Sequence, residues 1–378
     1  MTKQHSEIFQ FTLPEKLACP KPTEERGLHR DQVRLMVSNQ DGKQIGHHSF
    51  QDLAKLLNTG DVLVVNTSST IPAALPIKLP DGSPARLHLS TQLDENRWLI
   101  EVRSVQQNNT QRWTAGTSGQ SFELPGGASI KLEEQFYQKQ ELLQLWIAQL
   151  QVSPPLQDYL ATYASPVKYH GIDKPYPLDY YQTYFGQHPG STEMPSAARG
   201  FTEDLVNQLL EKGVQIVPIL LHTGVSSLEW NEHPYPEYLE ISALASQQIN
   251  SAKRKGKRII AVGTTAVRAL ESAADESGTV RPYRGLTELY IQANDQMKVA
   301  NGLLTGFHEP EASHLHMLQA IASKRHLRRA YQAALQEQYY WHEFGDLHLI
   351  LNDPEKRSWW GVAPEYLAKP QDWPRPEW

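Results

Sequence analysis

One short segment constrains the fold of this chain more than any other. Residues 258–262 form a short run that is rich in β-branched side chains and carries only the charge of Arg258, which is typical of a buried strand. Gly263 follows with two threonines, and Val267, Leu270 and Ala274 then recur at helical spacing. A strand that passes through a glycine into a helix favours an α/β fold. Such a helix N-terminus can hold a phosphate, a carboxylate or a ribose, although an ordinary capped turn explains the same residues.

Three other apolar runs end in the same way. Each is followed by side chains with hydroxyl, amide or imidazole groups: Asn66 after residues 61–65, His222 after residues 214–221, and Thr305 and His308 after residues 303–304. In α/β folds the ends of the strands are where ligands bind. The four clusters therefore predict one shared cleft, unless each is a simple turn.

Composition limits the possible environment and partners. The net charge is −6, so a nucleic acid would have to be bound by a local basic patch. The only cysteine is Cys19, which excludes an internal disulfide framework and fits a reducing cytosol. The N-terminus is polar, and no apolar run approaches the roughly 18 residues of a membrane span. We expect a cytoplasmic protein, with a monomer as the simplest state.

The character of the chain changes twice. Between about residues 74 and 152 it consists of short alternating segments separated by turns such as Asp81-Gly82, which predicts five or six antiparallel strands. Helical patterns resume at Thr202, which is placed to cap a helix that ends at Gly213. We expect an α/β main domain formed by residues 1–74 and 153–352, a small antiparallel β-barrel inserted at 75–152, and an irregular tail at 353–378.

Residues 259–272 resemble the signature of the S-adenosylmethionine:tRNA ribosyltransferase-isomerase family of queuosine biosynthesis. Other segments are similar to motifs of that family in the same order: residues 60–66 with 71–73, 181–184, 221–224, 304–308 and 344–346. The resemblance spans about residues 8–351. It implies a barrel-like α/β domain with an inserted β-barrel, in agreement with the change of character along the chain.

The resemblance also implies a reaction. In the family, S-adenosylmethionine is a co-substrate that donates its ribosyl carbons to 7-aminomethyl-7-deazaguanine in tRNA. Adenine and methionine leave, epoxyqueuosine remains in the tRNA, and no metal is required. The site must remove a proton next to the sulfonium, hold a ribose and exclude water.

On this basis we assign candidate residues. His222 and His308 are the candidate proton acceptors, although either can be a structural histidine. Residues with suitable hydrogen-bonding or charged groups are the candidate substrate ligands: Asn66, Thr264, Thr265, Arg268, Glu271, Thr305 and Asp346. Their alternative roles are turn formation, helix capping and solvated or paired surface charges. Glu271 is close enough along the helix to orient Arg268.

Two basic clusters, residues 253–258 and 324–329, are candidate tRNA contacts, although solvated helix ends explain them equally well. The histidines and glutamates between residues 308 and 316 match no standard zinc spacing, so we expect no metal. Several family motif positions differ here: Ser69 and Ala74 stand where arginines are usual, and Gly200 where a histidine is usual. The alternatives are thus a paralogue acting on another nucleoside or adenosyl substrate, and a catalytically silent RNA- or ligand-binding protein.

Overall fold

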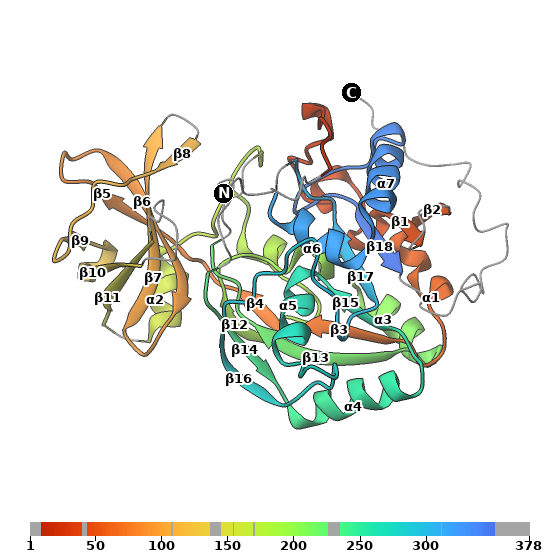
Figure 1. Cartoon of the computed structure of the whole chain (residues 1–378). Coiled ribbons are helices and arrows are strands. Elements are labelled where there is room, and N and C mark those ends of the chain that lie inside the picture. Colours follow the sequence, from red (N-terminus) through yellow and green to blue (C-terminus); the bar gives the residue numbers. More distant parts are fainter. Residues whose placement is uncertain are drawn as a thin grey trace, which may run out of the picture.

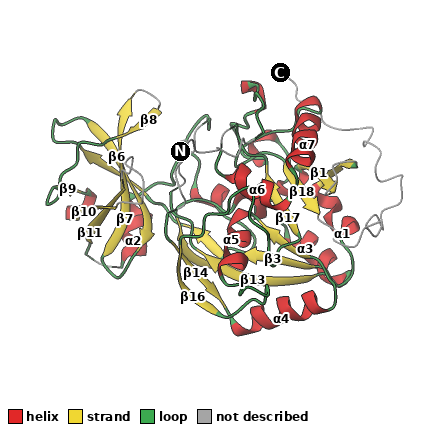
Figure 2. Ribbon diagram, viewed as in Figure 1, coloured by secondary structure: helices red, strands yellow, loops and turns green. Residues whose placement is uncertain are grey.

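The computed structural model describes residues 9–39, 44–106, 109–136, 145–153, 155–168, 171–225, 235–310 and 312–351. These residues form a large mixed sheet covered by helices and a second, antiparallel sheet beside it (Figure 1, Figure 2). The predicted α/β fold with an inserted antiparallel β domain is confirmed. The predicted tail at 353–378 lies outside the described residues.

The large sheet has nine strands. Their order is β16 (Tyr283–Thr287), β14 (Glu237–Ile241), β13 (Gln215–Leu221), β3 (Val62–Asn66), β15 (Ile259–Val262), β17 (Gly302–Gly306), β18 (Leu347–Leu351), β1 (Arg34–Asn39) and β2 (Ile45–Ser49). Strands β13, β3, β15 and β17 are parallel, whereas β14 and β18 run antiparallel to their neighbours β13 and β17. The carboxyl ends of the four parallel strands and the amino ends of β14 and β18 therefore meet at one edge, here called the site edge.

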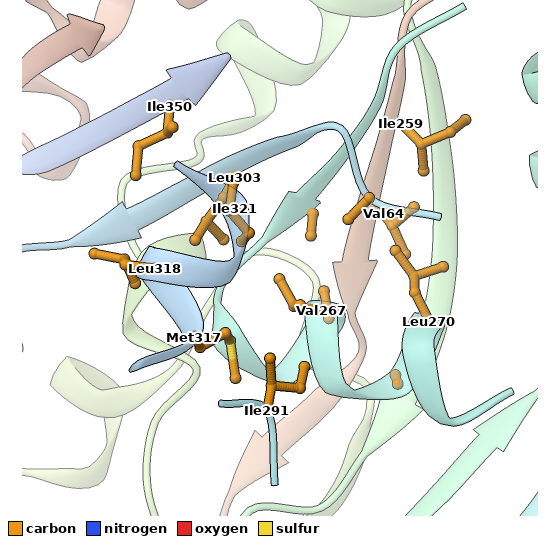
Figure 3. Packing of buried hydrophobic residues seen from close by; sticks show 14 of the residues in the cluster. Val64, Ile259, Val267, Leu270, Ile291, Leu303, Met317, Leu318, Ile321 and Ile350 are labelled. Atoms are coloured by element: carbon orange, nitrogen blue, oxygen red, sulfur yellow. The ribbon is translucent and has the colours of Figure 1, made fainter. Parts of the chain in front are cut away.

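Both faces of this sheet are buried, which explains why its central strands are apolar throughout. Because side chains alternate along a strand, Val62 and Val64 face one core while Leu63 and Val65 face the other. The first core is covered by α4 (Ala243–Arg254), α5 (Thr264–Ser272), α6 (His314–Ile321) and α7 (Lys324–Gln336). The second is covered by α1 (Leu53–Leu56) and α3 (Glu203–Glu211). Figure 3 shows part of the first core, where Val267 and Leu270 of α5 pack beside Val64 and Met317.

The position of helix α5 is set by the apolar side chains that recur along it. Val267 and Leu270 are fully buried, and each such side chain contributes about 1.5–3 kcal/mol when it leaves water. This packing holds the first turn of α5 at the site edge. The predicted helix between Thr202 and Gly213 is also confirmed. Thr202 Oγ1 accepts a hydrogen bond from Leu205 N at its start, and Gly213 has a φ of 82° after its end.

The inserted sheet contains seven strands rather than five or six. They are β5 (Ala74–Lys78), β6 (Pro84–Gln92), β7 (Arg97–Gln106), β8 (Asn109–Arg112), β9 (Ser121–Glu123), β10 (Ser129–Phe136) and β11 (Leu145–Gln151). Every pairing is antiparallel, in the order β5-β6-β7-β11-β10-β9 with β8 on β7, and β5 also lies close to β9, so the sheet curls towards a barrel. Its separate core includes Tyr159 and Leu160 of α2 (Leu156–Tyr163).

Short elements connect the two sheets. Strands β4 (Ser68–Thr70) and β12 (His188–Ser191) form a parallel pair. Single 3-10 turns are Glu15–Leu17, Glu24–Arg26, Arg30–Gln32, Phe50–Asp52, Pro125–Gly127, Leu178–Tyr181 and Ser196–Ala198. The inserted sheet is fastened to the site edge, because Val225 N donates to Ser90 Oγ at 3.0 Å and Thr91 Oγ1 donates to Pro236 O at 2.7 Å.

Candidate functional site

A cavity of about 160 Å³ lies at the site edge. Its walls are the segments that follow β13, β15, β16 and β17, the residues around the start of β14 and just before β18, residues 193–197, and the first turn of α6. The antiparallel direction of β14 and β18 is what brings their amino ends to this cavity. The site is therefore a product of sheet topology, as expected for ligand sites in α/β folds.

The N-terminus of α5 forms one wall of the cavity. Gly263 precedes the helix with a φ of 90°, a backbone conformation that favours glycine. Among the described residues, no side chain forms a capping hydrogen bond at the start of this helix. Thr264 and Thr265 occupy its first turn and line the cavity, and Thr265 Oγ1 is buried without a hydrogen-bond partner among the described residues. A buried hydroxyl without a partner destabilises the folded protein, so this group is placed to serve a ligand.

Arg268 lies one turn further along α5, and its side chain is only 8% exposed. One guanidinium nitrogen is ion-paired with Glu237, and Nε donates to Leu289 O at 3.1 Å. Glu237 also accepts a hydrogen bond from Gly224 N at 3.1 Å. The remaining nitrogen, Nη2, has no partner in the described part of the chain, although it is buried. Two unused donors, Thr265 Oγ1 and Arg268 Nη2, thus belong to residues of the same cavity wall.

Two stacked histidines form a second wall. His308 and His314 have ring centroids 4.6 Å apart and nearly parallel planes, and His308 Nε2 lies 2.9 Å from Thr305 Oγ1. Burial lowers the pKa of His314 to about 4, with a smaller contribution from the positive charge of Arg268. Burial also holds the pKa of His308 well below its ordinary range, helped by His314 and His348. Both rings are therefore neutral at pH 7.

An acidic side chain that sequence reasoning did not identify completes the cavity. Glu343 lies on its wall and is hydrogen-bonded to Ser196. Removal from water raises the pKa of Glu343 to about 7, and the charge of Glu309 acts in the same direction. The available signal was its position directly before the motif at residues 344–346. Its environment could not be deduced because Ser196 and Glu309 belong to distant segments.

Four predicted site residues do not line the cavity. Asn66 is fully buried, and its amide exchanges two hydrogen bonds with the backbone of Leu221, at 2.8 and 3.0 Å. Glu271 accepts three backbone hydrogen bonds from residues 298–300 and does not orient Arg268, which is paired with Glu237 instead. Asp346 accepts from Arg34 N and Tyr340 N, and burial raises its pKa.

His222, the fourth of these residues, lies beside the cavity. Its Nδ1 is 2.7 Å from Ser68 Oγ, its ring stacks on Tyr238, and burial lowers its pKa to about 4. Its neighbours Thr223 and Gly224 line the cavity in its place. Any side chain at Gly190 would collide with the imidazole, since an added Cβ would lie 2.5 Å from it. These contacts give His222 a supporting position at the end of β13.

The two basic clusters are placed very differently. In residues 253–258, Arg258 is buried and ion-paired with Asp61, and Lys253 Nζ donates to two backbone carbonyls. This cluster precedes β15 and thus lies at the opposite edge from the cavity. In residues 324–329, Arg325 and Arg328 are exposed on the first two turns of α7, which follows α6 directly.

Among the described residues, no group of three or more histidine, cysteine, aspartate or glutamate side chains is arranged to hold a metal ion. None of their helices combines the length and the apolar character needed to cross a bilayer.

Comparison with known proteins identifies the family. The model of a family described as "Queuosine biosynthesis protein" matches residues 6–350. The chain belongs to this family. The S-adenosylmethionine:tRNA ribosyltransferase-isomerase of Desulforamulus reducens is 34% identical over 91% of this chain and 98% of that protein. The enzyme of the same name from Pelotomaculum thermopropionicum is 33% identical over 91% and 98%. The resemblance deduced from the motifs is thereby confirmed.

A solved structure of the family supports the fold. The S-adenosylmethionine tRNA ribosyltransferase of Thermotoga maritima matches with a TM-score of 0.51 and 25% identity, over 91% of this chain and all of that one. The family signature therefore coincides with the α5 wall of the cavity: residues 263–265 and Arg268 belong to both.

Proposed function

We propose that this protein transfers and isomerises the ribosyl moiety of S-adenosylmethionine onto 7-aminomethyl-7-deazaguanine in tRNA, giving epoxyqueuosine-tRNA. The family and the names of its relatives support the reaction. The observation on which the proposal rests is the pair of unused donors, Thr265 Oγ1 and Arg268 Nη2, at the N-terminus of α5. These groups match the carboxylate of the methionyl end of the co-substrate.

The chemistry of this wall favours an anion. The helix N-terminus adds a partial positive charge, and the guanidinium adds a full one. Glu237 forms an ion pair with one guanidinium nitrogen of Arg268 and leaves Nη2 without a partner among the described residues. The ion pair also fixes the plane of the guanidinium, so that Nη2 stays available to a ligand. A carboxylate accepted here requires little reorganisation of the protein, because both donors are already buried and in place.

The neutral histidines suit the other half of the co-substrate. The face of an uncharged, buried imidazole is an apolar surface that can pack against the adenine or the ribose without repelling the sulfonium. The hydroxyl of Thr305 is 2.9 Å from His308 Nε2 and fixes the orientation of that ring. We therefore assign Thr264, Thr265, Arg268, Thr305 and His308 to co-substrate binding.

For the tRNA, we propose the exposed arginines at the start of α7. The first two turns of α7 carry four cationic side chains, and the partial positive charge at the helix N-terminus repels them. Binding of an anionic partner would offset this unfavourable repulsion. Helix α6 leads from the cavity to this cluster and is about 12 Å long. A phosphate backbone bound at residues 324–329 would thus lie within reach of the cavity.

The deciding experiment is a turnover assay with the full substrate. The protein is incubated with S-adenosylmethionine and a tRNA that contains 7-aminomethyl-7-deazaguanine, and the nucleosides are analysed by mass spectrometry. We expect epoxyqueuosine in the tRNA together with free adenine and methionine. Calorimetric binding of S-adenosylmethionine without any such products would instead favour a paralogue with another acceptor, and absence of binding would favour a silent protein.

A further inference from the structure

The proposed reaction needs a group that removes a proton from the carbon next to the sulfonium. A general base works best when its pKa is close to the operating pH. His308 and His314 line the cavity, but their low pKa values make them weak bases. His222 has a pKa of about 4 and its Nδ1 is engaged with Ser68. The histidines that sequence reasoning favours are therefore poorly suited to this step.

The cavity wall contains three acidic side chains: Glu193, Glu237 and Glu343. Glu237 is committed to Arg268 and Gly224, so protonating it would break a buried ion pair. Glu343 differs because it is ion-paired with no cation in the described part of the chain. Arg30 and Arg199 line a small neighbouring cavity that Glu343 also borders, but both guanidinium groups are ion-paired with Glu24, at 3.0 and 2.5 Å.

The turn that presents Glu343 is tightly held. His342 has a φ of 76°, which is uncommon for a residue other than glycine, and its Nε2 lies 2.7 Å from Glu309 Oε1. Gly345 admits no side chain, because an added Cβ would lie 2.6 Å from Tyr340 O. Phe344 packs against the guanidinium of Arg199, and its carbonyl accepts a hydrogen bond from Arg26. Strain kept in place by surrounding contacts is a recurring feature of functional turns.

We propose that the carboxylate of Glu343 is the proton acceptor of the reaction, held by Ser196 and by the turn at residues 341–345. In this step the C–H bond next to the sulfonium breaks and its electron pair stays on that carbon as a sulfonium ylide. The proton forms an O–H bond with a carboxylate oxygen of Glu343. The inference rests on the proposed function, and it assigns the base to a residue that is neither of the histidines chosen from sequence.

The surrounding charges make a second, independent readout possible. Glu309 is the ionisable group whose charge opposes the ionisation of Glu343. The other ionisable groups around Glu343 are those of the same cavity and the two ion-paired arginines of the neighbouring one: Glu193, Glu237, Arg268, His308, His314, Arg30 and Arg199. Glu309 is half exposed and does not line the cavity. Removing the charge of Glu309 should therefore let Glu343 ionise at a lower pH without touching the substrate. It also removes the contact between Glu309 and His342, and the thermal midpoint of the variant will register that loss.

The test measures single-turnover adenine release between pH 5.5 and 9 with the tRNA substrate, and S-adenosylmethionine binding by calorimetry. For the wild type we expect the rate to rise about tenfold per pH unit below about pH 7 and then to level off. Glu343→Gln should lower the rate at least about 100-fold and abolish this acid limb, while its Kd changes less than about threefold. Glu343→Asp should recover part of the rate, and Glu309→Gln should move the limb to lower pH.

Several results would overturn the assignment. A Glu343→Gln enzyme within about fivefold of the wild-type rate, or one that keeps the acid limb, excludes Glu343 as the base. Loss of the limb in Glu193→Gln but not in Glu343→Gln transfers the role to Glu193. If Glu343→Gln does not fold, an unmoved limb in Glu309→Gln counts against the proposal. Failure of the proposed function is distinct, because the wild type itself would then release no adenine.

Discussion

Replacing Thr265 with valine separates a binding role of this residue from a structural one. The two side chains have the same branched shape, so valine fits the first turn of α5, and only the hydroxyl is lost. In the folded protein this hydroxyl is buried and caps nothing, with no partner among the described residues. Its removal therefore deletes a desolvated polar group and no intramolecular hydrogen bond.

Thr265→Val is expected to weaken the binding of S-adenosylmethionine without lowering the stability of the folded protein. A hydrogen bond from Thr265 to a ligand carboxylate contributes about 1–2 kcal/mol, which corresponds to a roughly 5- to 30-fold weaker Kd for S-adenosylmethionine in Thr265→Val. The thermal midpoint should stay constant or rise by up to a few degrees. Calorimetric titration and thermal unfolding of the same preparation measure both quantities.

Thr202 provides a matched control. Its Oγ1 accepts from Leu205 N and donates to Asp31 at 3.1 Å, so Thr202→Val removes a helix cap remote from the cavity. It should destabilise the protein by about 1 kcal/mol and leave the Kd unchanged. A Thr265→Val variant that behaves in the same way, with a lowered midpoint and an intact Kd, would refute the assignment of this hydroxyl to the ligand.

Three further changes test the remaining assignments. Arg268→Lys should weaken S-adenosylmethionine binding by at least about tenfold in calorimetry, because one ammonium cannot replace a planar fork that serves Glu237, Leu289 O and a ligand together; an unchanged Kd would contradict this. The pKa of Glu343 in the folded protein is about 7, above its ordinary 4.5, so protonation of this carboxyl stabilises the folded state. This contribution to the free energy of unfolding, about 3 kcal/mol, is fully present below pH 4.5 and is lost as the pH rises through about 7. Urea unfolding should therefore show Glu343→Gln gaining stability over the wild type between pH 5 and pH 8, and a constant difference would show that this carboxyl is not desolvated. Reversing Arg325 and Arg328 to glutamate should weaken tRNA binding and flatten its salt dependence without altering S-adenosylmethionine affinity; the same reversal of the exposed Arg254 and Lys255 at the opposite edge is the control, and equal losses in both variants would contradict a specific patch at α7.

Sequence reasoning was most successful where the governing interactions are local. The continuous apolar run of β3, the glycine before α5 and the cap at Thr202 are all determined within a few residues, and each has the expected structure. Local patterns are less reliable where a segment is short. The apolar spacing of Phe50, Leu53, Leu56 and Leu57 predicts one helix, but the structure has only a 3-10 turn followed by the single turn of α1. That segment's apolar side chains are buried by tertiary packing, and burial alone does not require a long helix.

The roles of individual polar residues depended on distant partners. Asn66 looks like a ligand residue in the sequence, but Leu221, 155 positions away, uses both ends of its amide. Arg268 was expected to interact with Glu271 on its own helix, whereas its partner is Glu237, 31 positions away. The local sequence gives no sign of the role of Glu343, because an isolated glutamate is normally solvated. Only the direction of β18 brings it to the cavity.

The amino-acid sequence alone determined the class of fold, the inserted antiparallel domain and the family, because periodicity, turn residues and collinear motifs are properties of the chain itself. Only the tertiary structure decided which side chains face the cavity and with which charge. Burial and ion pairing arise between segments far apart in sequence, and they set whether an imidazole stays neutral, whether a hydroxyl remains unused and whether a carboxyl holds its proton near pH 7.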